Sequence, residues 1–90
     1  MKSLAPAIQV IEVANEGFDA LLSKSVTLFC ANYIYTGTLV GNNAEFVTLS
    51  DASIVYETGP FLDPKWKDAQ PLPNAVYIQK ASIEAFTVLK

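Results

Sequence analysis

One stretch decides the fold class: residues 37–52, GTLVGNNAEFVTLSDA. Its β-branched and aromatic residues favour pleated strands on either side of a turn. The turn signal is Gly41-Asn42-Asn43, because Gly and Asn tolerate positive φ. Gly37 lies inside the first strand, where a missing side chain often marks a bend or bulge. Such a bend lets a small sheet curl over on itself.

The β character continues on both sides of this stretch. Five segments are rich in Val, Ile, Thr, Tyr and Phe: 25–30, 33–40, 45–57, 75–79 and 83–89. Before them, residues 15–23 predict a short helix with Asn15 as its N-cap, preceded by an arm over residues 1–14. Five short strands after one helix, without strand–helix alternation, predict a mainly β fold that forms a small antiparallel barrel.

Residues 57–74, ETGPFLDPKWKDAQPLPN, form a long irregular segment that holds four of the five prolines. Loops beyond about 12–15 residues are usually functional or disordered. Inside this one, Trp66 lies between Lys65 and Lys67, a pattern that platforms for single-stranded nucleic acid use. A Trp in a Pro-rich loop can equally fold back over an apolar seam or pack on a neighbouring subunit. Packing is the favoured interpretation, and these three residues are candidate loop contacts.

Length and composition exclude several classes of protein. The chain has 90 residues, 51% of them hydrophobic and 17% charged, which indicates one folded domain rather than a disordered chain. Its apolar runs are far shorter than the roughly 18–20 residues of a membrane span, and no signal peptide opens it. We therefore expect a soluble cytoplasmic domain without a membrane partner.

Charge and reactive side chains narrow the choice further. The net charge is −3, all six cations are lysines, and the sequence pI is near 4.6, which is unlike a typical basic nucleic-acid-binding domain. Cys30 is the single cysteine and His is absent, so an internal disulfide and a multi-thiolate metal site are excluded. No nucleophile, phosphate-loop or metal-ligand motif occurs. We expect no enzyme, no catalytic residue, no metal and no cofactor.

The order of these elements resembles the Sm and Sm-like proteins. A short helix ending in LLSKSVTLFC is followed by GTLVGNNAEFVTLSDA, a variable loop and VYIQKASIEAFTVL. The family's first motif, G-x-L-x-G with a closing L-x-D-A, is matched by Gly37, Leu39, Gly41, Leu49, Asp51 and Ala52. The second motif, two strands around a short turn, corresponds to Val76–Gln79 and residues 83–89. The resemblance implies a five-stranded, strongly bent antiparallel Sm-like barrel over residues 15–90, preceded by a short N-terminal helix, with residues 57–74 as a variable loop.

Departures from the family bear on RNA binding. Family members hold a base between an aromatic or His side chain and an Arg, while an Asn reads the base edge. Here the first motif is one residue short, which leaves two registers open, and the Asn position holds Val47 or Phe46. Lys80 stands near the position of the Arg. The resemblance therefore implies weak or altered recognition of single-stranded RNA.

Four residues are candidates for RNA contact: Asn42, Asn43, Phe46 and Lys80. Each also has a simpler interpretation. Turn chemistry explains the two Asn residues, Phe46 flanked by apolar residues fits a barrel core, and Lys80 fits a solvated turn. These simpler interpretations are the favoured ones.

The last predicted strand would be an apolar sheet edge, which is an aggregation hazard unless another strand pairs with it. In the family, the fourth strand of one subunit pairs with the fifth strand of the next and closes a ring. The candidate interface residues are Val76, Tyr77, Ile78, Phe86 and Val88.

Two hypotheses about function follow. One is a homo-oligomeric ring of about five to seven copies, of prokaryotic or phage type, that binds RNA at its pore rim. The other is an oligomeric scaffold or protein-interaction module that binds no RNA and uses residues 57–74 for contact.

Overall fold

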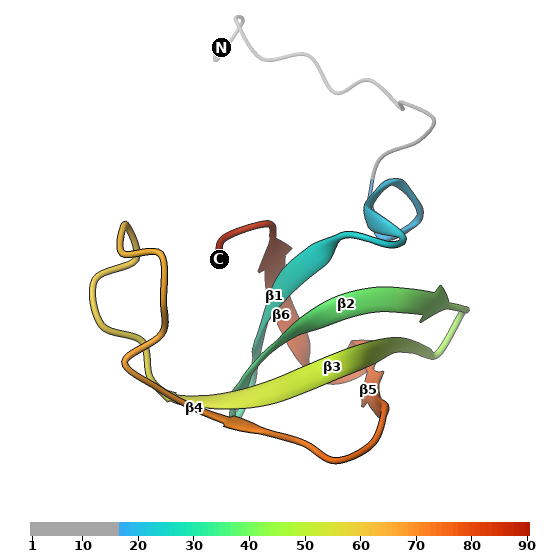
Figure 1. Ribbon diagram of the computed structural model, residues 1–90. Coiled ribbons are helices and arrows are strands. Elements are labelled where there is room, and N and C mark those ends of the chain that lie inside the picture. Colours follow the sequence, from blue (N-terminus) through green and yellow to red (C-terminus); the bar gives the residue numbers. More distant parts are fainter. Residues whose placement is uncertain (1–16) are drawn as a thin grey trace, which may run out of the picture.

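A computed structural model describes residues 17–90, which form a single six-stranded antiparallel sheet (Figure 1). The strands are β1 (Ser25–Cys30), β2 (Ile34–Asn42), β3 (Phe46–Glu57), β4 (Asp68–Pro71), β5 (Val76–Gln79) and β6 (Ile83–Thr87). Two short 3-10 helices, η1 (Asp19–Leu21) and η2 (Lys80–Ser82), precede β1 and link β5 to β6. The predicted mainly β, antiparallel fold is confirmed.

The sheet follows the order β4-β3-β2-β1-β6, and β5 also pairs with β3. The long strand β3 serves two partners, because its first half pairs with β5 and its second half with β4. The chain thereby brings its last strand, β6, back to the first, β1 (Figure 1). Consecutive strands are neighbours in most of the sheet, as short connections favour.

The sheet bends at Gly37 of β2, where the pairing of β2 with β3 is irregular. The β2–β3 register shifts there, so that Thr36 pairs with Ser53 and Thr38 with Ser50. A Cβ atom at Gly37 would lie 2.9 Å from the Ser50 carbonyl oxygen. The two backbones therefore approach too closely for any side chain, which explains the glycine. Asp51, inside the bulge, has φ 49°, and strand β3 continues past it to Glu57.

The core is built from four strands of this sheet, β1, β2, β3 and β5. Alternating residues of the strands supply it, since successive strand side chains point to opposite faces. Its buried members are Val26, Leu28, Leu39, Val47, Leu49, Ala52 and Ile78. Burying an aliphatic side chain of this size stabilises a fold by about 1.5–3 kcal/mol. The core therefore joins strands from both halves of the sheet.

The helix predicted over residues 15–23 is reduced to one 3-10 turn within the described residues. Asn15, its predicted N-cap, and the predicted arm over residues 1–14 lie outside them. Tertiary contacts account for the difference. Phe18 stacks on Phe86 of β6 with ring centroids 4.0 Å apart, and the Ser23 N–H donates to the Leu39 carbonyl at 2.7 Å. The backbone after Leu21 thus bonds to β2 instead of continuing a helix.

The segment predicted as irregular, residues 57–74, contains the strand β4, so six strands replace the predicted five. Pairing with β3 produces it, with Ala69 opposite Val55 and Gln70 opposite Ile54. Pro71 is tolerated because β4 is an edge strand. Strand β2 also extends through Asn42, which leaves the turn to residues 43–45. Among residues 17–90, no helix is long and apolar enough to cross a membrane.

Candidate functional site

A cleft of about 390 Å³ lies between the β2–β3 turn and η2. We call it the turn cleft, and its lining residues are Ala44, Glu45, Phe46, Gln79, Lys80 and Ala81. The Lys80 N–H donates to the Glu45 carbonyl at 2.8 Å and so ties the two walls together. Two segments about 35 residues apart in the chain are brought to one place by the pairing of β5 with β3.

The wall formed by the β2–β3 turn is fixed by Asn43. Its side-chain oxygen Oδ1 accepts hydrogen bonds from the N–H groups of Glu45 at 2.8 Å and Phe46 at 2.9 Å. This is the local turn chemistry for which Asn is favoured. Asn43 therefore shapes the cleft, and its acceptor oxygen is already engaged.

Two of the four predicted RNA-contact residues, Phe46 and Lys80, line the turn cleft. Phe46 packs edge-on against Tyr77, with ring centroids 5.4 Å apart. The Lys80 ammonium lies 5.2 Å from the centre of the Phe18 ring. Neither side chain belongs to the buried core, and both are half-buried. An aromatic surface and a cation therefore share one cleft.

Asn42 lies apart from the cleft lining. Its Nδ2 donates to the Asp19 carboxylate at 2.8 Å and links the end of β2 to η1. Its Oδ1 is buried and has no hydrogen-bond partner among the described residues. The contacts of Asn42 are those of a residue that holds two structural elements together.

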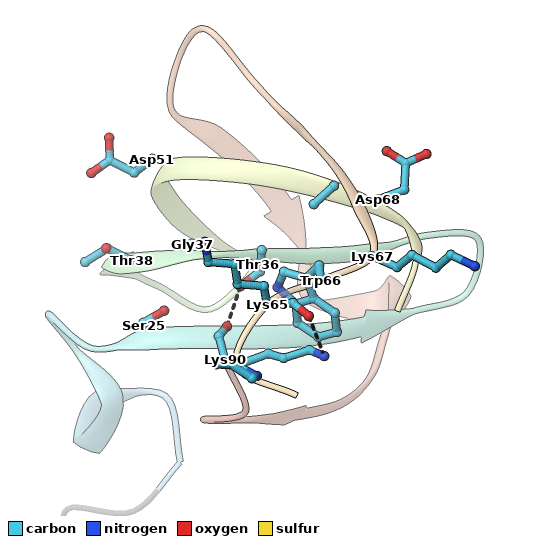
Figure 2. A pocket seen from close by; sticks show the side chains of 12 residues that line it. Ser25, Thr36, Gly37, Thr38, Asp51, Lys65, Trp66, Lys67, Asp68 and Lys90 are labelled. Atoms are coloured by element: carbon cyan, nitrogen blue, oxygen red, sulfur yellow. Dashed lines mark hydrogen bonds between the residues drawn. The ribbon is translucent and has the colours of Figure 1, made fainter. Parts of the chain in front are cut away.

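A second cleft, of about 560 Å³, lies beside the loop between β3 and β4 (Figure 2). It places Trp66 and Lys65 next to the bend at Gly37 and next to Lys90. The Lys90 ammonium lies 4.5 Å from the centre of the Trp66 ring. No local sequence pattern points to Lys90, since nothing links it to a tryptophan 24 positions earlier. Trp66 is half-buried, in the loop that the sequence marked as a contact segment.

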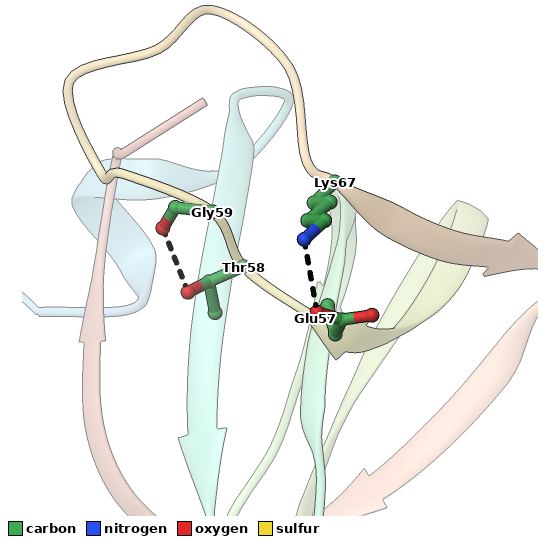
Figure 3. Close-up of polar contacts among 4 residues, drawn as sticks. All are labelled: Glu57, Thr58, Gly59 and Lys67. Carbon is green, nitrogen blue, oxygen red and sulfur yellow. Dashed lines mark hydrogen bonds and ion pairs between the residues drawn. The ribbon is translucent and has the colours of Figure 1, made fainter.

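Lys67, the third predicted loop contact, forms an ion pair with Glu57 at 3.4 Å (Figure 3). Both side chains are largely exposed to solvent, and such pairs contribute little to stability. At the base of the same loop, the Thr58 hydroxyl donates to the Gly59 carbonyl at 2.9 Å (Figure 3). These contacts close the loop where it leaves β3.

The predicted interface residues differ in exposure. Tyr77 is 66% exposed, Val88 55% and Phe86 37%, whereas the Ile78 side chain is buried in the core of the same chain. Val76 is half-buried and packs against that core. Within residues 17–90, β5 pairs only with β3 and β6 only with β1, so each strand keeps one edge without a strand partner.

Two ionisable side chains, Cys30 and Tyr35, have raised pKa values and are therefore weaker acids than usual. Burial, with a smaller contribution from Glu84, raises the pKa of the Cys30 thiol above its ordinary value. Burial also raises the pKa of Tyr35, as do the neighbouring Cys30 and two tyrosines. In the described part of the chain, no three Cys, Asp or Glu residues gather closely enough to hold a metal ion.

Comparison of the chain with protein-family models, with curated proteins and with solved structures finds no match.

Proposed function

We propose that this protein is a ring-forming, Sm-like barrel that binds single-stranded RNA weakly through the turn cleft. The observation that carries the proposal is the 2.8 Å hydrogen bond from the Lys80 N–H to the Glu45 carbonyl. Through it, the turn that resembles the first family motif meets the turn that resembles the second. Phe46 and Lys80 come to line one cleft as a result.

Three features support the Sm-like form of the barrel. Strand β6 returns to pair with β1, a short 3-10 helix links the last two strands, and β2 bends at Gly37. The Sm-like proteins that the sequence resembles have a strongly bent small barrel with this order of elements. We identify β5 and β6 with the last two strands of that barrel.

The free edges of β5 and β6 support assembly into a ring. Pairing of β5 in one copy with β6 in the next would satisfy the free edges of both strands. Tyr77, Phe86 and Val88 would then lose much of their exposed apolar surface. A head-to-tail contact of this kind closes into a ring when the rotation per subunit allows it.

The chemistry of the turn cleft favours a base and a phosphate together. Stacking of a base on an aromatic side chain contributes about 1–3 kcal/mol, and Phe46 offers such a ring. Lys80 supplies a cation for the backbone, while Glu45 on the opposite wall offsets part of its charge. Binding at one cleft is therefore weak, and repetition around a ring multiplies it.

RNA binding is tested by titrating a fluorescently labelled oligouridine at several salt concentrations. We expect affinity that falls steeply with salt, and a Lys80→Ala variant with weaker binding and a smaller salt slope. Lys24→Ala is the matched control, because Lys24 is an exposed lysine outside the turn cleft. Absence of binding at low salt, or an equal loss in both variants, would contradict the RNA part of the proposal.

Ring assembly is tested by the native mass of the purified protein. We expect one closed multimer, and a Val88→Lys variant that dissociates, because it places a charge on the proposed interface. Val40→Lys is the control, since Val40 is also about half exposed but lies on β2, away from that interface. A stable 9.8 kDa monomer in the unmodified protein would contradict the ring.

A second candidate function is an oligomeric scaffold that binds no RNA. The loop between β3 and β4 favours it, because this loop displays Leu62, 98% exposed, beside the half-exposed Phe61. Apolar side chains presented in this way suit contact with another protein. An intact ring without measurable oligonucleotide binding would support the scaffold over the RNA-binding ring.

A further inference from the structure

Three backbone carbonyls of the β3–β4 loop converge on one ammonium group. The Lys90 Nζ donates to the carbonyl oxygens of Pro60 at 2.8 Å, Lys65 at 3.1 Å and Thr58 at 3.2 Å. The Trp66 ring covers the same nitrogen, with its centre 4.5 Å away (Figure 2). We call this arrangement of three carbonyls and one ring the ammonium cage.

The cage matches the chemistry of a primary ammonium. Such a group has three N–H donors and no acceptor, and here each donor has a carbonyl partner. A cation over the face of a tryptophan gains further from the negative face of the ring. We propose that residues 58–66 form a binding site for a primary ammonium, occupied by Lys90 of the same chain, and that this occupancy holds the loop in its observed shape.

The loop backbone is shaped to point these carbonyls inward. Gly59 adopts φ 65°, a conformation that residues other than glycine rarely adopt, and it lies between the Thr58 and Pro60 carbonyls. The Asp63 N–H donates to the Pro60 carbonyl at 3.1 Å, and the Lys67 N–H to the Thr58 carbonyl at 3.4 Å. Without the ammonium, the Lys65 carbonyl would lose its hydrogen-bond donor. The Pro60 and Thr58 carbonyls would each lose one of their two donors.

Lys90, which occupies the cage, also bridges two parts of the fold. The backbone carbonyl of Lys90 accepts a hydrogen bond from the Thr36 hydroxyl at 3.4 Å, which anchors residue 90 to β2 (Figure 2). Its side chain then reaches the loop more than 20 residues earlier in the chain. The loop tip, with the exposed Leu62, is thus held relative to the sheet by this lysine. Occupancy of the cage decides whether that tip keeps a defined position.

Chemical rescue tests the proposal directly. Trp66 is the sole tryptophan of the chain, so its fluorescence reports on the cage. In Lys90→Ala, we expect a shifted emission maximum and faster chymotrypsin cleavage around Phe61 and Leu62. The atoms removed correspond to n-propylammonium, which should restore both signals at about 10–100 mM, because a free ligand lacks the millimolar effective concentration of a tethered one.

Three controls separate this site from simpler explanations. Lys65→Ala should behave as the unmodified protein, because Lys65 contributes its backbone carbonyl and not its side chain. Tetramethylammonium, a cation without N–H donors, and sodium chloride at equal ionic strength should not rescue. Circular dichroism of Lys90→Ala checks that the sheet is intact. If it is not, Lys90→Met replaces it, and because this variant keeps the apolar stem and lacks only the ammonium, ammonium chloride takes the place of propylammonium as the rescuing ligand.

The proposal is overturned if loss of the ammonium leaves fluorescence and cleavage unchanged. It is also overturned if propylammonium has no effect, or if tetramethylammonium restores the signals equally well. The experiment needs neither RNA nor a ring, so its result is independent of the proposed function.

Discussion

Two lysines of this protein each lie over an aromatic ring, and they differ in what else they contact. The Lys80 ammonium, in the turn cleft, contacts the Phe18 ring at 5.2 Å, and among the described residues it donates no hydrogen bond. The Lys90 ammonium contacts the Trp66 ring at 4.5 Å and donates to three carbonyls. A lysine whose donors are all satisfied acts as part of the structure. A lysine with free donors is available to a ligand.

The backbone around the two lysines differs in the same way. In the turn cleft, the side chain of Asn43 and the β3–β5 pairing satisfy the backbone. In the β3–β4 loop, the Lys90 ammonium is the partner of the Lys65 carbonyl and a second donor to the Pro60 and Thr58 carbonyls. The first region can therefore keep its shape while its lysine binds something else, whereas the second cannot.

The largest expected effect comes from removing the bend at Gly37, which lines the cleft beside the β3–β4 loop. Gly37→Ala would place a Cβ atom 2.9 Å from the Ser50 carbonyl and 3.1 Å from the Ala52 Cα. Both neighbours are backbone atoms that cannot turn aside, so we expect a loss of about 1–3 kcal/mol in the free energy of unfolding. Urea denaturation measures it.

Val40→Thr is the control for this change, because Val40 lies on the same strand and is about half exposed. We expect it to alter the free energy of unfolding by at most about 0.5 kcal/mol. Equal stability of Gly37→Ala and the unmodified protein would show that the bend tolerates a side chain.

A smaller effect should be confined to the turn cleft. Asn43→Ala removes the acceptor for the N–H groups of Glu45 and Phe46, which we expect to cost about 1 kcal/mol at this exposed site. Asn43→Asp keeps an acceptor oxygen and should retain most of the stability. The fluorescence of Trp66 should stay unchanged in both variants. A fluorescence change would mean that the two regions are coupled.

The smallest effect concerns the stability of the protein at alkaline pH. The pKa of Cys30 is raised by burial and by Glu84, so the folded protein keeps its thiol proton at a pH where the unfolded chain loses it. Stability should therefore fall as pH rises above the unfolded thiol pKa of about 8.5 and level off above the raised pKa. Thermal unfolding at several pH values measures the decline.

Cys30→Ser isolates the contribution of the thiol, because serine does not ionise in that range. We expect the decline that begins above about pH 8.5 to become shallower in this variant. The raised pKa of Tyr35 adds a similar decline at higher pH and is retained there. An unchanged pH profile would argue against a thiol that the fold keeps protonated.

Much of the sheet could be predicted from local sequence. Strands β1, β2, β3 and β5 follow the predicted segments closely, because Val, Ile, Thr, Tyr and Phe fit a pleated, half-buried surface wherever it forms. The bend at Gly37 was also predictable, since only a missing side chain allows the Ser50 backbone so close.

Other features were decided by contacts between distant residues. The predicted helix over residues 15–23 yielded to the Phe18–Phe86 stack and to the bond between Ser23 and β2. Strand β4 formed in a proline-rich segment because β3 offered a free edge there. No periodicity or propensity encodes such a pairing.

The sequence by itself determined the β-rich class, most strand positions and the bend, because these depend on each residue's own side chain and its near neighbours. The tertiary structure alone decided which strands pair, where the turn cleft lies and which lysine is held. Lys90 shows the reason most clearly. Its three carbonyl partners lie 25 to 32 residues away along the chain, so the cage exists only after the sheet has brought its ends together.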